Sequence, residues 1–186
     1  AKVGIVTTGR LCSPAADTPA DREAARQATF DYARDPELWS WVYTHHLYLD
    51  PVVFGRFPAE MQGTPLAAMA AAVSPTDLAV MHQVPDFIGL NIYSGGTACA
   101  GPDGWQAVEP QPGAPRNAMK WLVAPEVLTW GPLWIRERYG LPLYITENGL
   151  SCNDKVYLDG CVHDTDRIDF LHRYLRALRT GIAQGS

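Results

Sequence analysis

LPLYITENGLSCND, residues 141–154, places a carboxylate at the end of a stretch that otherwise has the composition of a buried strand. Residues 141–147 are mainly apolar, which predicts a strand that ends at Glu147. In parallel α/β proteins, ligand-binding side chains gather at the carboxyl ends of strands. Glu147 is therefore a candidate site residue, although a loop carboxylate that only accepts backbone N–H groups would give the same pattern.

Strands and helices alternate along the rest of the chain. Two further strands are predicted over residues 2–8 (KVGIVTT) and 86–94 (DFIGLNIYS). Cap residues, prolines at first turns and apolar periodicity predict helices over residues 18–33, 35–55, 64–73, 74–83, 125–140 and 164–185. Residues 94–118, rich in Gly and Pro, are expected to form a long loop. This alternation predicts an α/β fold with a parallel sheet and right-handed crossovers.

Two of the predicted helices have apolar side chains at helical spacing, which should face the protein interior. These residues are Leu38, Trp41, Val42, His45 and Leu49 in the first helix, and Ile168, Leu171, Leu175, Leu178 and Ile182 in the second. The adjacent His45 and His46 are interpreted as surface or packed side chains. Asp164 is a candidate cap for the last helix.

The composition excludes several classes of function. The chain has 186 residues, a net charge of −5 and no basic block, so it has no general attraction to nucleic acid. It lacks an apolar run long enough for a membrane span, a dinucleotide or phosphate loop, and the ligand spacing of a metal site, so no cofactor is expected. A flavodoxin-like domain is disfavoured because no phosphate- or ligand-binding loop follows the first predicted strand. We expect a cytoplasmic protein, although a signal peptide removed before residue 1 would leave the same chain.

The four cysteines leave one alternative open. Cys152 and Cys161 flank a loop or hairpin and would be bridged in an oxidising compartment, whereas free thiols are typical of a cytoplasmic protein.

Polar side chains also end the strand over residues 86–94. Asn91 and Tyr93 are two residues apart, so both point to the same side of the strand. Asn or Tyr at a strand end often serves turn formation or packing, and the pattern alone does not assign them a ligand.

The sequence resembles glycoside hydrolase family 1, the retaining β-glucosidase family. LYITENG is similar to the nucleophile motif of the family, and DFIGLNIYS is similar to the strand before it. DTPADREAAR, LDPVVFGRFPAEM, GAPRNAMKWLVAPEVL and DGCVHDTDRIDFLHRYLRAL resemble further family segments in the same order. The resemblance implies that Glu147 is the nucleophile and that Tyr93 orients it. It also implies that Asn91 binds substrate and that Trp121 lines the aglycone side.

The resemblance also implies what this chain lacks. The Asn-Glu-Pro motif that supplies the acid/base glutamate in the family is absent, and neither Glu109 nor Glu126 is assigned that role. The family's last sugar-binding strand is absent too. We therefore expect residues 1–186 to form a single partial (β/α)8 TIM barrel of about three consecutive β-α units. Ile92 stands where the family often has a tyrosine.

Two functional hypotheses follow. In the first, the chain is part of a retaining β-glycosidase that acts on a β-glucoside or related small saccharide. The remaining strands of that enzyme then lie on another segment or chain. The second is a non-catalytic or self-associating fragment or pseudoenzyme, because open sheet edges favour homo-oligomers. Without its acid/base partner, Glu147 loses general acid help of roughly 10²–10⁴-fold, so the chain alone is expected to be almost inactive.

Overall fold

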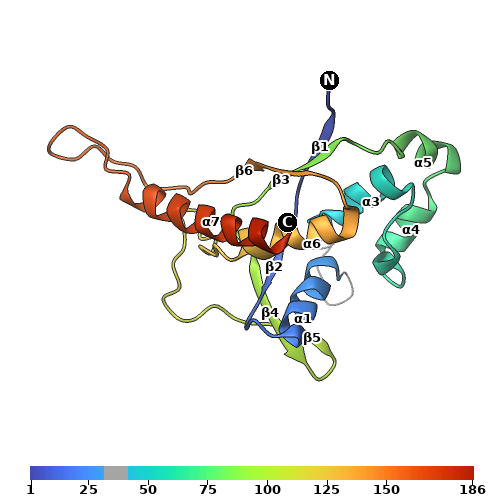
Figure 1. Cartoon of the computed structure of the whole chain (residues 1–186), viewed down its shortest axis with the longest axis horizontal. Coiled ribbons are helices and arrows are strands. Elements are labelled where there is room, and N and C mark those ends of the chain that lie inside the picture. The colour runs from blue at the N-terminus through green and yellow to red at the C-terminus, as the bar shows by residue number, and fades with distance from the viewer. Residues whose placement is uncertain (32–41) are drawn as a thin grey trace.

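A three-stranded parallel sheet organises the molecule (Figure 1). The computed structural model describes residues 1–31 and 42–186. The strands are β1 (Gly4–Thr8), β3 (Phe87–Asn91) and β6 (Leu143–Glu147), in the order β1-β3-β6. Both pairings are parallel, as the alternation of elements predicted.

The carboxyl ends of the three strands lie in one row. Thr8 pairs with Asn91, and Asn91 pairs with Glu147 after a shift of register beyond Leu90. The row fixes where polar side chains from three distant parts of the sequence meet.

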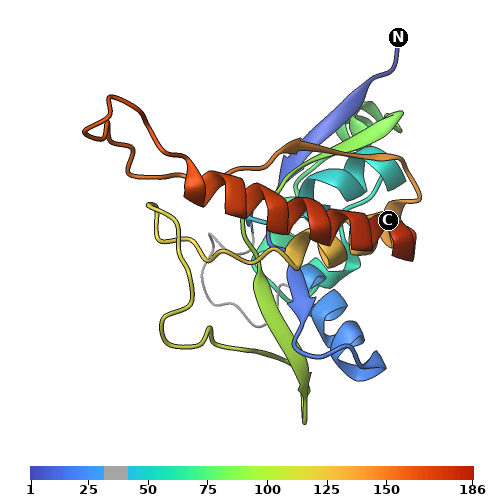
Figure 2. The same cartoon turned by 60° about the vertical axis from the view of Figure 1, so that its left-hand side comes forward.

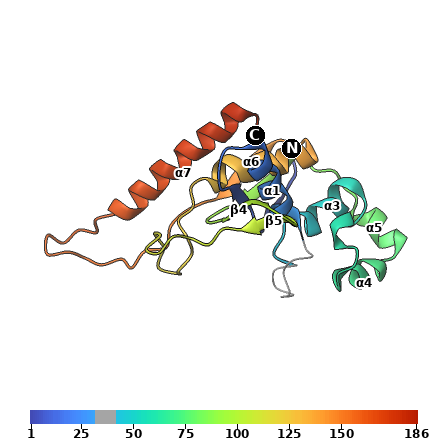
Figure 3. The same ribbon diagram turned by 90° about the horizontal axis from the view of Figure 1, so that it is seen from below.

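Helices follow each strand of this sheet. α1 (Pro19–Phe30), α3 (His46–Phe54), η1 (Ala59–Met61), α4 (Leu66–Ala71) and α5 (Pro75–Met81) lie between β1 and β3. α6 (Val127–Tyr139) precedes β6, and α7 (Thr165–Gln184) follows it. Figure 2 shows α7 as a long helix across the body of the molecule, and Figure 3 shows it along one side, with the loop before it extending outward. Leu38 and Trp41, predicted for the helix over residues 35–55, lie outside the described residues.

Only one face of the parallel sheet is covered within the described residues. Ile88 and Leu90 are fully buried in the main core, together with residues of α3 and α6 such as Leu49 and Leu128. On the opposite face, Val6 is 51% exposed and Tyr144 is 55% exposed. In a closed barrel this second face would line the interior. The sheet is thus a partial barrel with two open edges, as predicted.

Most of the apolar stripe predicted for α7 is exposed, which corrects the expectation from sequence, whereas its fifth residue, Leu178, packs against the main core as predicted. Ile168, Leu171, Leu175 and Ile182 are between 42% and 60% exposed. The buried residues of α7 are Phe170, Tyr174 and Gly181, and the helix packs on α6. A side chain at Gly181 would come within 2.7 Å of the Thr129 carbonyl oxygen, so the absence of a side chain there selects the packed face. The periodicity located an apolar face correctly, but α7 has two such faces.

Asp164 occupies the N-cap position of α7, as predicted. Its side chain, however, accepts no capping hydrogen bond from a backbone N–H and instead forms an ion pair with Arg167.

A small second sheet replaces much of the predicted loop over residues 94–118. β2 (Cys12–Pro14) pairs in parallel with β4 (Gly96–Gly101), which forms an antiparallel hairpin with β5 (Gly104–Ala107). Gly104 at the hairpin has φ 111°, a conformation that glycine adopts without steric cost. The turn residues between β4 and β5 therefore make a hairpin rather than an open loop.

α1 anchors this second sheet. Its Asp21 side chain accepts a 2.8 Å hydrogen bond from the backbone N–H of Ala100. Asp31, which follows α1, accepts a 2.7 Å bond from the indole of Trp105. These contacts join segments that lie more than 70 residues apart.

His45 and His46 are both buried, so the packed alternative is the correct one of the two offered by the sequence. His45 Nδ1 lies 2.9 Å from Thr7 Oγ1, and His46 Nε2 lies 3.0 Å from the Phe30 carbonyl oxygen. Burial lowers the pKa of His45 to about 4 and that of His46 to about 3. Both imidazoles are therefore neutral at neutral pH.

These buried histidines predict a loss of stability on mild acidification. Their folded pKa values lie below the ordinary value near 6.5, so the unfolded chain binds more protons as pH falls from 6.5. Each histidine should lower the free energy of unfolding by roughly 1.4 kcal/mol per pH unit well below pH 6.5. Denaturant unfolding measured between about pH 5 and 6.5 tests this, because carboxylates with ordinary pKa values near 4 remain mostly ionised in that range. His45→Gln should reduce the slope by about half, and an unchanged slope would contradict the assignment.

Candidate active site

A cavity of about 720 Å³ lies at the carboxyl ends of the parallel strands. The last residues of β1, β3 and β6, which are Thr8, Asn91 and Glu147, all line it. The other lining residues are Gly9, Arg10, Leu11, Tyr43, Tyr93, Ser94, Gly95, Gly96, Arg116, Lys120 and Trp121. The four residues that the sequence indicated, Asn91, Tyr93, Trp121 and Glu147, are thus brought to one cavity.

Glu147 and Tyr93 are in direct contact within this cavity. The Tyr93 hydroxyl donates a hydrogen bond to Glu147 Oε2. This hydrogen bond, together with some burial and the nearby carboxylate charge, raises the pKa of Tyr93 above its usual value. The phenol therefore stays protonated at neutral pH and remains a donor to the carboxylate. Glu147 itself is solvent-exposed, so a ligand in the cavity has access to it.

Backbone contacts fix the position of Tyr93. The Tyr174 hydroxyl on α7 donates a 2.9 Å hydrogen bond to the Tyr93 carbonyl oxygen and accepts one of 2.9 Å from the Ala124 N–H. The next residue, Ser94, donates its hydroxyl to the Leu122 carbonyl oxygen at 2.7 Å. Two segments, α7 and residues 122–124, thus hold the backbone at this tyrosine, which is the condition for a preorganised donor.

Asn91 is tied to the neighbouring strand. Its Oδ1 accepts a 2.7 Å hydrogen bond from the Thr146 hydroxyl. On the other side of Glu147, Asn148 Nδ2 donates to the Ile92 carbonyl oxygen at 2.8 Å. These two bonds connect the strand ends on either side of the carboxylate and restrict its backbone.

Trp121 lies beside Tyr93, with 5.9 Å between ring centroids and 54° between ring planes. Its backbone N–H donates to Asn117 Oδ1 at 2.9 Å, and the Asn117 N–H donates to its carbonyl oxygen at 2.9 Å. The indole is 42% exposed, although large apolar side chains usually find cover. An exposed aromatic face held by a tight turn is suited to stacking on a sugar or an aromatic group.

The sequence indicated four of the fourteen lining residues, and those it missed include Thr8, Arg10, Tyr43, Arg116 and Lys120. The rule that selected Glu147 also applies to Thr8, which ends its own strand. Tyr43 reaches the cavity because the chain passes very close at Gly9, where a Cβ would lie 2.7 Å from the His45 backbone nitrogen. The Arg10 N–H also donates to the Tyr43 carbonyl oxygen at 3.0 Å. Such a tertiary contact has no local sequence signal.

Glu147 is the one carboxylate among the described residues that line the cavity. Glu109 and Glu126, the rivals considered from sequence, do not line it. No cluster of three or more His, Cys, Asp or Glu side chains in the described part of the chain could hold a metal ion. No helix within residues 1–31 and 42–186 is long and apolar enough to cross a bilayer. All four cysteines, including Cys152 and Cys161, are free thiols.

Comparison with known proteins relates this arrangement to a family. The family model described as glycosyl hydrolase family 1 matches residues 1–186. Beta-glucosidase A of Thermotoga maritima is 30% identical over 99% of this chain and 39% of its own length. The bifunctional beta-D-glucosidase/beta-D-fucosidase of Bifidobacterium breve is 35% identical over 76% of this chain and 35% of its own length.

Solved structures agree with the sequence matches. A family 1 β-glucosidase from Thermotoga maritima, in complex with isofagomine lactam, superposes with a TM-score of 0.70 at 30% identity. The match covers 99% of this chain and 39% of that one. A complex of a Thermotoga maritima β-glucosidase with glucoimidazole also gives a TM-score of 0.70. The chain thus spans about two fifths of the length of these proteins, and it belongs to glycosyl hydrolase family 1.

Proposed function

We propose that this chain supplies the nucleophile half of the active site of a retaining β-glycosidase that acts on β-glucosides or related small saccharides. The observation that carries the proposal is the Glu147 carboxylate, hydrogen-bonded by Tyr93, at the carboxyl end of a parallel strand in a family 1 chain. A retaining glycosidase needs such a carboxylate to trap an oxocarbenium-like centre as a glycosyl ester.

The proposed first step uses the oxygen of Glu147 that Tyr93 does not occupy. Oε1 forms a bond to the anomeric carbon while the bond from that carbon to the aglycone oxygen breaks. The aglycone leaves with a proton supplied by a general acid. Tyr93 keeps its own proton and holds the carboxylate plane, so it acts on the orientation of the nucleophile. The general acid, now a base, takes a proton from water as the water oxygen bonds to the anomeric carbon. The ester bond to Glu147 breaks, the carboxylate is released and the original stereochemistry is restored.

The proposed general acid lies on another part of the enzyme. A retaining mechanism places a second carboxyl group about 5–5.5 Å from the nucleophile. The described residues of this chain offer none in the cavity. The uncovered sheet face and the exposed stripe of α7 support the proposal that further barrel elements cover this chain in the complete enzyme.

The same exposed surfaces favour a second candidate function, a non-catalytic module that associates with itself. Ile168, Leu175 and Ile182 on α7 are each about three fifths exposed. Contiguous exposed apolar residues mark interaction surfaces. Open sheet edges at β1 and β6 add backbone groups that a second copy would pair with.

Covalent labelling distinguishes the two candidates. A 2-deoxy-2-fluoro-β-glucoside with a dinitrophenyl leaving group needs little help from a general acid, so it isolates the nucleophilic step. Incubation of the enzyme that contains this chain should trap a fluoroglucosyl ester on Glu147, found by peptide mass spectrometry. A label on any other carboxylate would overturn the assignment. An unlabelled chain that self-associates with increasing concentration would favour the second candidate.

A further inference from the structure

The turn that carries Trp121 also carries two cations that the mechanism above does not use. Arg116 and Lys120 both line the candidate active site, and both are exposed. Arg116 Nη1 donates a 2.8 Å hydrogen bond to the Lys120 carbonyl oxygen, which places the two residues side by side. Within the described residues, no carboxylate forms an ion pair with either side chain.

Lys120 has an unusual backbone conformation. Its φ is 68°, and it is the one residue other than glycine with positive φ among those that the structure describes. The left-handed region is unfavourable for a residue with a Cβ, and lysine has no side-chain feature that favours it. Such strain concentrates at functional sites, where the surrounding structure maintains it. Here the Lys120 N–H donates to the Asn117 carbonyl oxygen at 2.9 Å, which closes the turn.

The neighbouring cavity does not explain the two cations. Arg116 and Lys120 also border a second cavity, which contains the carboxylates of the loop before α7 and of its first turns. Asp154 and Asp164 already pair with Arg167, and Asp169 pairs with Arg173. The fourth carboxylate of this cavity, Asp166, forms no ion pair with Arg116 or Lys120 in the described part of the chain. The cations of the turn are thus left available to a ligand in the active-site cavity.

The family resemblance assigns Trp121 to the aglycone side, so its neighbours in the turn, Arg116 and Lys120, belong to that side in this proposal. Glu147, which would bond to the sugar, contacts Tyr93; Tyr93 lies against the Trp121 ring, and Lys120 precedes Trp121 in the chain. An anionic group close to the anomeric carbon would be repelled by Glu147. An anionic group on an aromatic aglycone, stacked on Trp121, would reach the cations while staying beyond the carboxylate.

We propose that Lys120, supported by Arg116, selects β-glycosides whose aromatic aglycone carries a carboxylate. This inference rests on the proposed glycosidase function and names its substrate class. Lys120 is a specificity-determining residue in this proposal and takes no part in bond breaking.

The test compares two substrates on the complete glycosidase that contains this chain. The substrates are 4-carboxyphenyl β-glucoside and its neutral carboxamide analogue, and the measured quantity is the ratio of their kcat/KM values. Lys120→Gln should lower this ratio roughly 5- to 10-fold, because the carboxylate loses a charged partner that the carboxamide never had. Leaving-group differences cancel because wild type and variant are compared on the same pair.

Three further variants separate charge from backbone strain. Lys120→Gly relieves the strain and removes the charge, so it should lose the preference as Lys120→Gln does. Lys120→Arg should keep the preference. Lys155→Gln, which removes a lysine that borders only the second cavity, should leave the ratio unchanged. Added salt should weaken the wild-type preference.

The outcomes are distinguishable. If the enzyme hydrolyses both substrates but Lys120→Gln leaves the ratio unchanged, the inference is wrong and the glycosidase function stands. If neither substrate is hydrolysed, the proposed function itself fails. An equal loss on both substrates would show that Lys120 only maintains the turn.

Discussion

Glu147→Gln is expected to lower the kcat of the complete glycosidase by roughly 10⁴-fold or more, because the amide cannot form the glycosyl ester. Glutamine keeps the volume of the side chain and still accepts the hydrogen bond that Tyr93 donates to Oε2 in the native protein. The fold and the cavity should therefore survive. Hydrolysis of an aryl β-glucoside, measured with circular dichroism to verify folding, tests this expectation.

A variant with a smaller side chain at residue 147 tests whether Glu147 acts as the nucleophile. Glu147→Ala leaves space beside the anomeric carbon, so added azide should restore turnover of an activated aryl β-glucoside. The product should be the α-glycosyl azide, because one displacement inverts the configuration whereas two retain it. Glu109→Gln and Glu126→Gln remove carboxylates that do not line the cavity and should keep near wild-type activity. Activity of Glu147→Gln within tenfold of wild type would exclude Glu147 as nucleophile.

The candidate site was predictable from sequence where local pattern and strand position coincide. Asn91 and Glu147 end strands of a parallel sheet, so the general rule for α/β proteins brought them to one edge. Family resemblance, in contrast, was required to select Trp121, which lies in a turn. Arg116 and Lys120 lay in the same turn, but nothing local indicates that an exposed cation borders a cavity.

The wrong predictions about the fold have a common physical origin. The periodicity of α7 shows an apolar face, yet the packed face is determined by Phe170, Tyr174 and the close approach at Gly181. Likewise the hairpin of β4 and β5 depends on pairing with β2, which lies more than 80 residues away. Which helix face packs and which strands pair depend on segments that are distant in sequence, and a local pattern contains no information about those segments.

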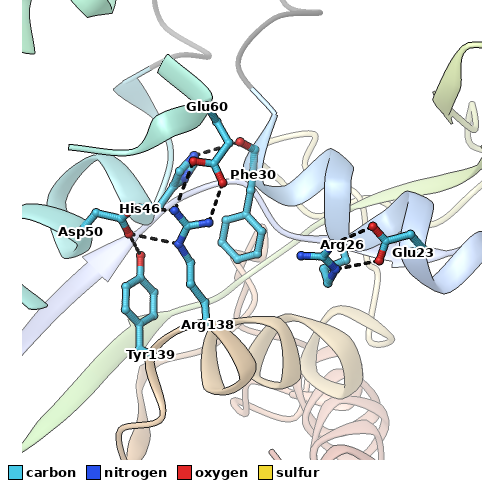
Figure 4. Close-up of polar contacts among 8 residues, drawn as sticks. All are labelled: Glu23, Arg26, Phe30, His46, Asp50, Glu60, Arg138 and Tyr139. Atoms are coloured by element: carbon cyan, nitrogen blue, oxygen red, sulfur yellow. Dashed lines mark hydrogen bonds and ion pairs between the residues drawn. The ribbon is translucent and has the colours of Figure 1, made fainter. Parts of the chain in front are cut away.

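A buried charge cluster joins α3, η1 and α6 (Figure 4). Arg138 donates to Asp50 Oδ1 at 3.1 Å and Oδ2 at 2.5 Å, and to Glu60 Oε1 at 2.7 Å. The Tyr139 hydroxyl donates to Asp50 Oδ1 at 2.5 Å, and the guanidinium lies 4.8 Å from the centre of the Phe30 ring. Only 4% of the Asp50 side chain is exposed. Burial opposes charge on Arg138, but the bonds to Asp50 and Glu60 outweigh it and raise the pKa of Arg138.

Removing Arg138 is expected to have the largest effect on stability. Arg138→Met keeps much of the apolar volume but leaves the Asp50 carboxylate buried without its cation. Loss of one partner of a buried pair costs about 3–5 kcal/mol, and denaturant unfolding at pH 7 measures it. Figure 4 also shows the matched control, in which Arg26 pairs with Glu23 on α1. Both side chains of that pair are more than 40% exposed, so Arg26→Met should cost less than about 1 kcal/mol.

A double variant identifies the cause of the loss. Arg138→Met leaves the Asp50 carboxylate without a cation, and Asp50→Asn removes that negative charge. The amide oxygen of the new side chain still accepts the hydrogen bond from the Tyr139 hydroxyl. If an uncompensated carboxylate is the cause, Asp50→Asn combined with Arg138→Met should be more stable than Arg138→Met alone. If the loss of stability reflects packing of the Arg138 side chain against Phe30, the free-energy costs of the two substitutions should instead add. Equal costs for Arg138→Met and Arg26→Met would show that the cluster contributes no more than a surface pair, because desolvation and attraction would then cancel.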